Sequence, residues 1–492
     1  MDKKIKYPLL ALAGAAAASV PVKAALYKPE KISVPPMPEE NVDVDRFRKN
    51  LSDAIKFKTI ASRNEEEIDW SVFDAFHDFL KERYPLIHEK LELTVINRAS
   101  LIYRWAGKRS DLDPIALLSH QDVVPISEGT WDDWEHDPFE GYDDGEFIWG
   151  RGAIDMKNHL IGVLESVETL LSEGFEPERD VYLLFGHNEE VMCAGKSNGA
   201  TSICDYLKEK GVHLDCIIDE GGAILPIDVK GVIDKHLAGI GVAERGYADI
   251  EVAVTAKGGH SSAAPNHTAV GKLADVIKDI ENHQFKTKMS PMVDSLFENI
   301  GRNCTYPVRL VTCNLKLIAP VVLKGLSYIP AAASMLRTTF GVTMASGSPQ
   351  ANVLPQRASV VVNFRMYPGQ TVDDMVKHLR KVIRNKKVEI TVLPGSKEAS
   401  AVSPTDSRAF KAIEMICHSM DDKAVVAPYL VMGGTDACHY QPICENIYRY
   451  SPFLVGTSLL LTTHGTNERL PVDIMGDAVK FFKRYIKTLS AE

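Results

Sequence analysis

Residues 114–122 read Pro-Ile-Ala-Leu-Leu-Ser-His-Gln-Asp, a short apolar run that ends in a histidine and an aspartate. A continuous apolar run of this length is typical of a strand buried on both faces of a sheet. Similar runs predict strands at 181–186 and 214–218, with helices between them near 156–173 and 198–210. Short buried strands that alternate with helices predict an α/β fold, an αβα sandwich with a mostly parallel sheet.

The pattern changes near residue 243, where half-buried alternating strands and amphipathic helices predict an α+β domain inserted into the first one. Its strands are expected at 247–256, 357–365 and 387–393, and its helices at 267–283 and 371–385. We therefore expect the first domain to comprise residues 45–242 and 398–492, and the inserted domain residues 243–397. The apolar stretch 318–326 is expected in the inserted domain's own core, although lining an acyl pocket is the alternative.

The N-terminus resembles a targeting segment. Lys3, Lys4 and Lys6 precede an apolar, alanine-rich run from Leu9 to Val22, and small residues follow it. This order is typical of a secretory signal peptide or an uncleaved anchor, and a disordered alanine-rich leader is the alternative. We therefore expect residues 1–25 to direct export (secreted, periplasmic or lumenal) or to anchor the protein in a membrane. Residues 26–44, with several prolines and charges, are predicted to be a linker.

Charge and cysteine content exclude some classes of protein. The net charge is -10 and the sequence contains no basic block, so a nucleic-acid partner is not expected. The eight cysteines show no C-x-x-C spacing, which argues against a zinc ribbon or a thioredoxin-type site. Cysteines of this kind in a large domain are most often small buried hydrophobic residues.

Residues with metal-binding side chains follow the predicted strands of the first domain. They are His120 and Asp122 after 114–119, Glu189 and Glu190 after 181–186, Asp219 and Glu220 at the end of 214–218, and Asp155 before the first helix. The carboxyl ends of parallel strands meet at one edge of a sheet, so these side chains are expected to lie together. That many carboxylates would repel one another unless cations neutralised them.

Imidazole and carboxylate ligands without a cysteine set suit zinc. An aspartate two residues after a histidine ligand, as Asp122 is after His120, can orient the imidazole through its second nitrogen. In the Glu189-Glu190 pair, one glutamate can bind metal while the other accepts a proton from water. Each motif alone is weak, because such residues are also common in solvated loops and turns.

One competing motif is Gly195-Lys-Ser197-Asn-Gly199, which matches the G-x-S-x-G pattern of serine hydrolases. That pattern needs a sharp turn directly from strand to helix, whereas several residues separate Ser197 from the strand 181–186. Readings as a phosphate loop or a dinucleotide fingerprint also fail, because glycines that those motifs require are absent.

Taken together, the motifs resemble the dizinc metallopeptidase and deacylase family, which includes aminoacylase, acetylornithine deacetylase and dipeptidases. The motifs that carry the resemblance are His120-x-Asp122, Gly150-Arg-Gly-Ala-Ile-Asp155, Glu189-Glu190, Asp219-Glu-Gly-Gly and Thr463-His464-Gly. Two longer stretches, 361–371 and 464–468, resemble most the carboxypeptidase S branch, which also holds an N-fatty-acyl-amino-acid synthase/hydrolase.

The resemblance implies two Zn²⁺ ions bridged by Asp155. His120 and Asp219 would complete one metal site, and Glu190 and His464 the other. Glu189 would be the general base, and Asp122 would orient His120. Glu220 remains an alternative to Asp219, and His439 competes with His464 as the late imidazole, although a structural role for His439 is favoured.

For the inserted domain the resemblance implies a lid. His260 would stabilise the oxyanion, and Arg365 and Asn352 would hold the substrate, with Arg365 binding its terminal carboxylate. A surface salt bridge is the alternative for Arg365. A homodimer that forms through the lid is a further expectation from the family.

The function predicted in this way is hydrolysis of the amide bond of an N-acyl amino acid or short peptide with a free carboxylate. The implied mechanism is attack by a metal-bridging hydroxide, and the reaction could also run in reverse. Two alternatives remain: a non-catalytic scaffold of the same fold that has lost its metals, and a serine hydrolase that uses Ser197.

Overall fold

The computed structural model describes residues 21–29, 32, 34–191 and 197–491. The predicted signal peptide lies mostly outside these residues, as does Gly195-Lys196 of the serine-hydrolase motif. The chain forms two compact units, which are described separately. Unit 1 comprises residues up to 242, 294–315 and from 403 onward, and unit 2 comprises 243–293 and 316–402. The segment 294–315, which was expected in the inserted domain, thus belongs to unit 1.

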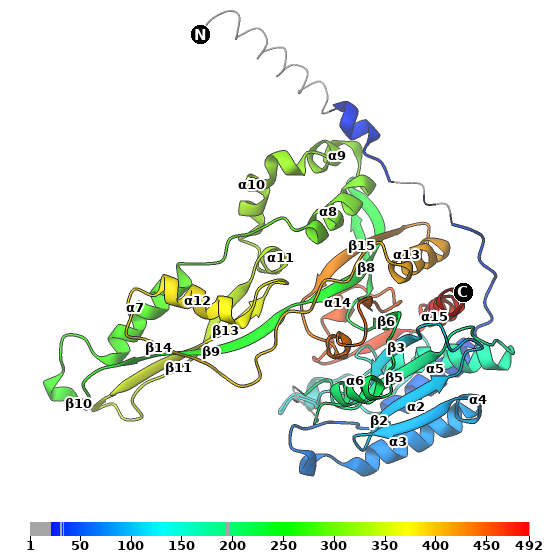
Figure 1. Ribbon diagram of the computed structural model, residues 1–492, viewed down its shortest axis with the longest axis horizontal. Coiled ribbons are helices and arrows are strands. Elements are labelled where there is room, and N and C mark those ends of the chain that lie inside the picture. Colours follow the sequence, from blue (N-terminus) through cyan, green and yellow to red (C-terminus); the bar gives the residue numbers. More distant parts are fainter. Residues whose placement is uncertain (1–20, 30–31, 33, 192–196, 492) are drawn as a thin grey trace, which may run out of the picture. The chain divides into compact units, whose positions relative to one another are not determined.

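Unit 1 is built on a nine-stranded mixed sheet with the order β1-β2-β5-β3-β6-β16-β8-β15, and β7 pairs with β8 (Figure 1). The strands are β1 (Glu92–Ile96), β2 (Ser100–Trp105), β3 (Ile115–His120), β5 (Val181–Gly186), β6 (Cys216–Asp219), β7 (Ile224–Val229), β8 (Ile233–Glu244), β15 (Ala424–Val431) and β16 (Ile447–Arg449). Pairing is parallel in the centre, from β5 through β3 and β6 to β16, and antiparallel for β1–β2, β2–β5, β16–β8 and β7–β8. The predicted α/β class is confirmed, but the expectation of a mostly parallel sheet was wrong, because antiparallel strands flank the parallel centre on both sides.

Helices cover both faces of this sheet. Every residue of β3 and β5 is buried, as expected of strands covered on both sides. On one face α5 (Lys157–Ser172) packs against β3, and α2 (Val44–Ile55), α4 (Pro85–Lys90) and α15 (Met475–Ser490) pack against α5. On the other face α6 (Gly199–Glu209) packs against β2, β5 and the 3-10 helix η5 (Asp436–Tyr440). The helices α3 (Trp70–Arg83), α13 (Arg408–Met420) and α14 (Thr457–Leu460), and the short helices η1 (Glu65–Glu67) and η2 (Trp131–Asp133), also belong to this unit.

A separate two-stranded ribbon joins distant parts of unit 1. The strand β4 (Phe147–Trp149) pairs with β17 (Arg469–Pro471) in antiparallel register, Trp149 opposite Arg469. Because β4 leads into the loop that holds Asp155, this ribbon places the loop before β17 beside it.

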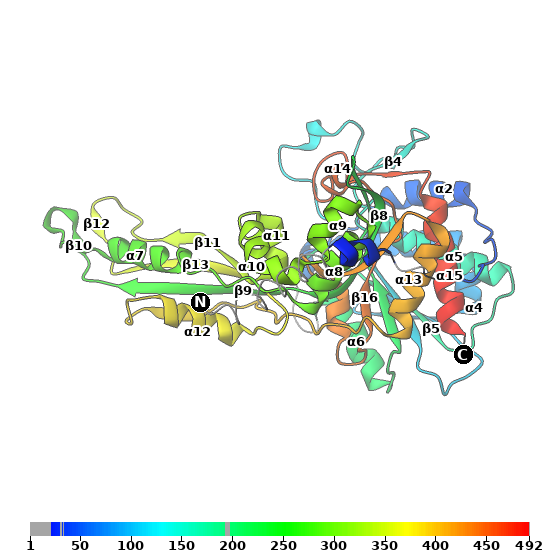
Figure 2. The same ribbon diagram turned by 90° about the horizontal axis from the view of Figure 1, so that it is seen from above.

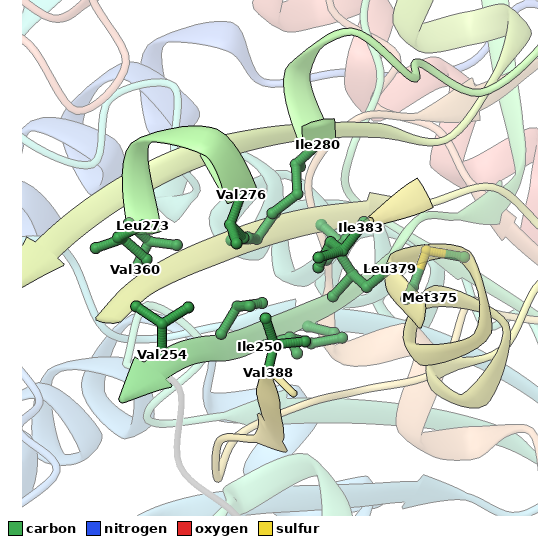
Figure 3. Close-up of a cluster of buried hydrophobic side chains, with 14 of the residues drawn as sticks. Ile250, Val254, Leu273, Val276, Ile280, Val360, Met375, Leu379, Ile383 and Val388 are labelled. Atoms are coloured by element: carbon green, nitrogen blue, oxygen red, sulfur yellow. The ribbon is translucent and has the colours of Figure 1, made fainter. Parts of the chain in front are cut away.

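Unit 2 is an antiparallel sheet covered by two helices, which is the predicted α+β architecture. The strand order is β11-β13-β9-β14, and the strands are β9 (Gly246–Thr255), β11 (Thr339–Ser346), β13 (Arg357–Met366) and β14 (Glu389–Val392). The helices are α7 (Ala269–Glu281) and α12 (Val372–Val382). Their apolar side chains, such as Val276 and Leu379, meet Ile250 of β9 in one buried core (Figure 3).

A small ribbon lies at one end of the strands of unit 2. It pairs β10 (Gly259–His260) with β12 (Val353–Leu354), and η4 (Ser261–Ala263) follows β10 (Figure 2).

The chain between α7 and β11 forms four helices that the sequence pattern did not resolve. They are α8 (Pro291–Asn303), α9 (Tyr306–Thr312), α10 (Leu315–Leu326) and α11 (Pro330–Leu336). The expectation that the stretch 318–326 lies in a core was wrong, because none of the residues of α10 is buried. Among the described residues no single helix has both the length and the apolar character needed to span a membrane, and α9 and α10 meet these conditions only as a pair bent by 89°.

The seven cysteines in the described part of the chain are free and buried, as predicted for small hydrophobic residues.

Candidate active site

The candidate site lies at the carboxyl edge of the central parallel strands of unit 1. His120 is the last residue of β3, and Glu189 and Glu190 follow β5. Glu220 comes directly after β6, and Asp155 lies in the loop between β4 and α5. Three neighbouring strands and one loop therefore deliver these side chains to one place, as expected for parallel strands.

The imidazole of His120 is the centre of this cluster. Its Nε2 lies 3.3 Å from Oδ1 of Asp155 and 3.4 Å from Oε1 of Glu220. Two groups of ligand atoms, each within 4.8 Å of one another, share His120: one with Glu189 and Glu220, and one with Asp155 and Glu190. Each group has the spacing of donors that hold a metal ion.

His464 reaches the cluster from the other end of the chain. Its Nε2 lies 3.1 Å from Oδ2 of Asp155 and 3.1 Å from Oε2 of Glu190. The backbone of His464 is left-handed, with φ of 60°. Asp155 thus contacts one imidazole with each carboxylate oxygen, which is the arrangement that a bridging ligand requires.

Asp122 is fully buried and holds neighbouring residues of the cluster in place through hydrogen bonds. Its carboxylate accepts hydrogen bonds from the backbone N–H groups of Glu189 and Glu190, both at 3.1 Å. The Nδ1 atom of His120 lies 2.9 Å from the backbone carbonyl oxygen of Asp122 and 3.4 Å from its carboxylate. A neutral His120 therefore carries its proton on Nδ1 and leaves Nε2 free to bind a metal.

At the end of β6, the structure brings Glu220 to the cluster and not the predicted ligand Asp219. The Asp219 carboxylate accepts a hydrogen bond from the N–H of Ala437 in η5 at 2.9 Å. Successive residues of a strand point to opposite faces, so only one of this pair can face His120. The sequence could not show which one, because both faces of β6 are buried and its run of Cys-Ile-Ile has no polar alternation.

Two further acidic residues that we did not predict support the site. The fully buried Glu468 accepts hydrogen bonds from Arg151 at 2.6 Å and from the N–H groups of Gly152, Ile154 and Asp155 at 3.1, 2.8 and 3.1 Å. It thereby fixes the loop of Asp155. The sequence could have indicated Glu468 as a candidate, because it lies four residues after the predicted ligand His464.

The other residue is Asp436 of η5, which lies against the end of β5. A Cβ atom on Gly186 would lie 2.2 Å from the Asp436 carboxylate, so a larger residue at this position would displace that carboxylate. Burial and the charge of Glu220 raise the pKa of Glu189, the charge of His120 opposes this shift, and the charge of Asp436 adds to it.

The electrostatics show an excess of negative charge. Burial raises the pKa of Glu189 well above its usual value, and the charge of Glu220 adds to this. Burial, followed by the charge of Asp155, raises the pKa of Glu220 to about 8. Burial also raises the pKa of Glu190, although its hydrogen bond with His464 opposes the shift. Protons are therefore favoured where no other cation neutralises these carboxylates.

The same negative charge favours the protonated, charged form of the two histidines. Hydrogen bonds with Asp155 and Glu190 raise the pKa of His464 to about 10. Burial opposes protonation of His120, but Glu220 and the other carboxylates outweigh it and raise its pKa well above the usual value. Both imidazoles thus lie in a field that attracts positive charge, and their nitrogen and oxygen surroundings fit zinc.

The three predicted lid residues lie in unit 2 and do not form one group there. His260 at β10 and Asn352 before β12 are neighbours, since the N–H of Ser261 donates to the Asn352 carbonyl at 3.0 Å. Arg365 lies near the opposite end of β13, eight residues or roughly 26 Å of strand from Arg357. All three are exposed, and the Arg365 guanidinium lies 4.8 Å from the centre of the Tyr247 ring.

The competing residues have structural contacts. Ser197 is exposed, and its backbone carbonyl accepts a hydrogen bond from Asn188 at 2.7 Å. The Nδ1 atom of His439 in η5 lies 3.0 Å from the hydroxyl of Thr201 in α6. This position agrees with a structural role for His439.

Comparisons with known proteins agree with this geometry. The model of a family described as Peptidase family M20/M25/M40 matches residues 116–488. A probable carboxypeptidase S-like protein 2 of Dictyostelium discoideum is 37% identical, over 89% of this chain and 84% of the relative. An N-fatty-acyl-amino acid synthase/hydrolase of Xenopus tropicalis is 31% identical, over 89% of this chain and 84% of the relative.

Among solved structures, an M20 family metallo-carboxypeptidase from Sulfolobus solfataricus matches with a TM-score of 0.62 at 20% identity, over 90% of this chain and 99% of that one. Human carnosine dipeptidase 1 matches with a TM-score of 0.60 at 13% identity, over 96% and 98% of the two chains. At these identities the structural matches show the fold alone.

Proposed function

Because the chain belongs to peptidase family M20/M25/M40, whose enzymes are metal-dependent, we propose that it is a two-zinc hydrolase of N-acyl amino acids or short peptides. The bond cleaved would be the amide next to a free carboxylate. The observation that carries this proposal is the cluster of His120, Asp155, Glu190, Glu220 and His464 around Glu189.

The proposed metal ligands divide between two positions that share Asp155. His120 with Glu220 would hold one ion, and Glu190 with His464 the other. Two bound zinc ions would lower the pKa of water and polarise the carbonyl group of the substrate. Asp122 would keep His120 in the correct tautomer and hold the backbone of the glutamate pair in place.

Glu189 is the proposed proton carrier. Among the described residues no hydrogen-bond donor contacts its carboxylate, so that it is available to water or substrate. A carboxylate whose pKa is raised by burial is a better base than an exposed one, and it can then return the proton to the leaving amine. The same residues would serve the reverse reaction, in which amine and acid condense.

The substrate class follows from the names of the relatives. A peptide cleaved by a carboxypeptidase and an N-acyl amino acid both present an amide bond beside a free carboxylate. We propose that Arg365 binds this carboxylate, that Asn352 contributes to substrate binding, and that His260 stabilises the oxyanion. Export or membrane anchoring through residues 1–25, and a homodimer formed through unit 2, also remain proposals.

The test is release of free amino acid from a panel of N-acetyl and N-fatty-acyl amino acids and dipeptides, with and without a zinc chelator. Activity that a chelator abolishes and zinc restores is expected. Folded protein with neither metal nor activity would instead indicate a scaffold. Chelator-resistant activity that Ser197→Ala abolishes would indicate a serine hydrolase.

A further inference from the structure

The helix α10 exposes an apolar face. Its sequence, Leu-Lys-Leu-Ile-Ala-Pro-Val-Val-Leu-Lys-Gly-Leu, has two charged residues, Lys316 and Lys324, and no residue of the helix is buried. Leu317 and Val321 are 78% and 76% exposed, and Tyr328 just after the helix is 76% exposed. An apolar surface of this kind marks an interaction site, because a helix of such composition is normally buried.

The spacing of these residues describes how the surface is built. Leu317 and Val321 are four residues apart and lie on the same side of the helix. Lys316 and Lys324 flank them, and long lysine side chains can lie along an apolar surface with their charges at its border. The helix has 12 residues, about 18 Å, which is shorter than a hydrocarbon core of about 30 Å. A helix of this length is too short to cross a bilayer, but it can lie along the surface of one.

The sequence that contains this helix carries charges of one sign. The sequence contains no aspartate or glutamate between Glu298 and Asp373, although the whole chain carries a net charge of -10. Lys316 and Lys324 lie in the helix itself and Arg337 lies in the same interval, whereas Arg302 is paired with Glu298 at 2.6 Å. Basic residues beside an apolar helical face are typical of elements that bind anionic lipid surfaces.

The N-terminal segment is fixed to the same part of the chain. The backbone carbonyls of Pro21, Tyr27 and Lys28 accept hydrogen bonds from Tyr306, Arg309 and Arg302 at 3.3, 3.3 and 3.2 Å. The helical residues 21–26 expose Val22 and Leu26. The described part of the N-terminal segment therefore contacts α8 and α9, and two residues separate α9 from α10 in the sequence.

We propose that α10 is a membrane-binding surface whose partner is a phospholipid bilayer with anionic headgroups. The basic border favours a bilayer over a second copy of the chain, because two such borders would repel each other. This inference does not depend on the proposed function, since none of these residues belongs to the candidate active site.

The direct test places a tryptophan on the surface. In the full-length chain, the emission of Leu317→Trp is expected to be quenched by vesicles of phosphatidylcholine and phosphatidylserine with brominated acyl chains. The control is Val270→Trp on α7, because Val270 is also exposed, at 50%. Quenching that is no greater for Leu317→Trp than for Val270→Trp would overturn the proposal.

A second experiment measures binding to vesicles by flotation. Leu317→Ser with Val321→Ser is expected to weaken vesicle binding at least tenfold, whereas Val229→Ser with Val270→Ser leaves it unchanged. Lys316→Glu with Lys324→Glu should weaken binding to anionic vesicles and leave binding to neutral ones unaffected. Equal binding by all variants, or dissociation of a dimer by the Leu317 and Val321 changes without any vesicle binding, would refute the proposal.

Discussion

Glu468 and the glutamates of the candidate site are neighbours in unit 1, but they are held in different ways. Glu468 is buried with Arg151 as its counter-ion and three backbone N–H groups as donors. Glu189, Glu190 and Glu220 share two imidazoles with Asp155 instead, although burial raises the pKa values of all four glutamates. The buried carboxylate with a structural role is stabilised by donors of the same chain. The carboxylates of the candidate site share two imidazoles, and a bound cation would balance their remaining charge.

The largest effect is expected from Glu189→Gln, which keeps the shape of the site and removes its proton carrier. Turnover should fall about 10²–10⁴-fold, the usual contribution of a general base. Zinc content, measured by elemental analysis, should stay at the parent value. A variant that keeps the parent kcat would show that another group carries the proton.

Glu468→Gln tests whether Glu468 stabilises the fold. It leaves Arg151 buried without a counter-ion, so the free energy of unfolding should fall by about 3–5 kcal/mol. Urea denaturation measures this loss, and Glu128→Gln, at an exposed glutamate, is the control with little change. A loss no greater than that of the control would contradict a structural role for Glu468.

The pair Asp219 and Glu220 at the end of β6 allows the two kinds of carboxylate, structural and metal-binding, to be compared in adjacent residues. Glu220→Gln should weaken zinc binding about 100-fold, the upper end for residues that support a metal site. Asp219→Asn should keep the zinc and lower the free energy of unfolding by about 1–2 kcal/mol, through its weakened bond to Ala437. Zinc titration of both variants decides the assignment, and the reverse result would restore Asp219 as the ligand.

The smallest effect concerns two buried histidines with opposite surroundings. His120 faces carboxylates, whereas burial, with a contribution from His120, lowers the pKa of His159 to about 3. The pKa of such a histidine is lower in the folded protein than in the unfolded chain, where it is near 6.5. As the pH falls below that value, the unfolded chain binds the proton first, so the free energy of unfolding decreases.

His159→Gln should therefore reduce the loss of stability between pH 7 and pH 5 by up to about 2 kcal/mol. Denaturation at the two pH values measures the difference, and His213→Gln, at an exposed histidine, should not change it. An unchanged slope in His159→Gln would mean that His159 is already protonated in the folded protein.

The sequence predicted the strands and their polar ends well, because β3 and β5 are continuous apolar runs that stop at His120 and Gly186. It could not predict which way a side chain points from a strand buried on both faces, as at Asp219 and Glu220. It also failed for α10, because apolar composition usually indicates burial and a single sequence does not show what an apolar face contacts. The role of Glu468 required long-range pairing, which local patterns do not contain.

The ribbon of β4 and β17 has a consequence for synthesis. His464 and Glu468 lie near the end of the chain, whereas the loop that they complete is made in its first third. Domains generally fold as units while the ribosome extends the chain, so this unit cannot complete the candidate site until residues 464–468 have been synthesised. Until then the loop of Asp155 lacks the carboxylate of Glu468 that fixes its backbone.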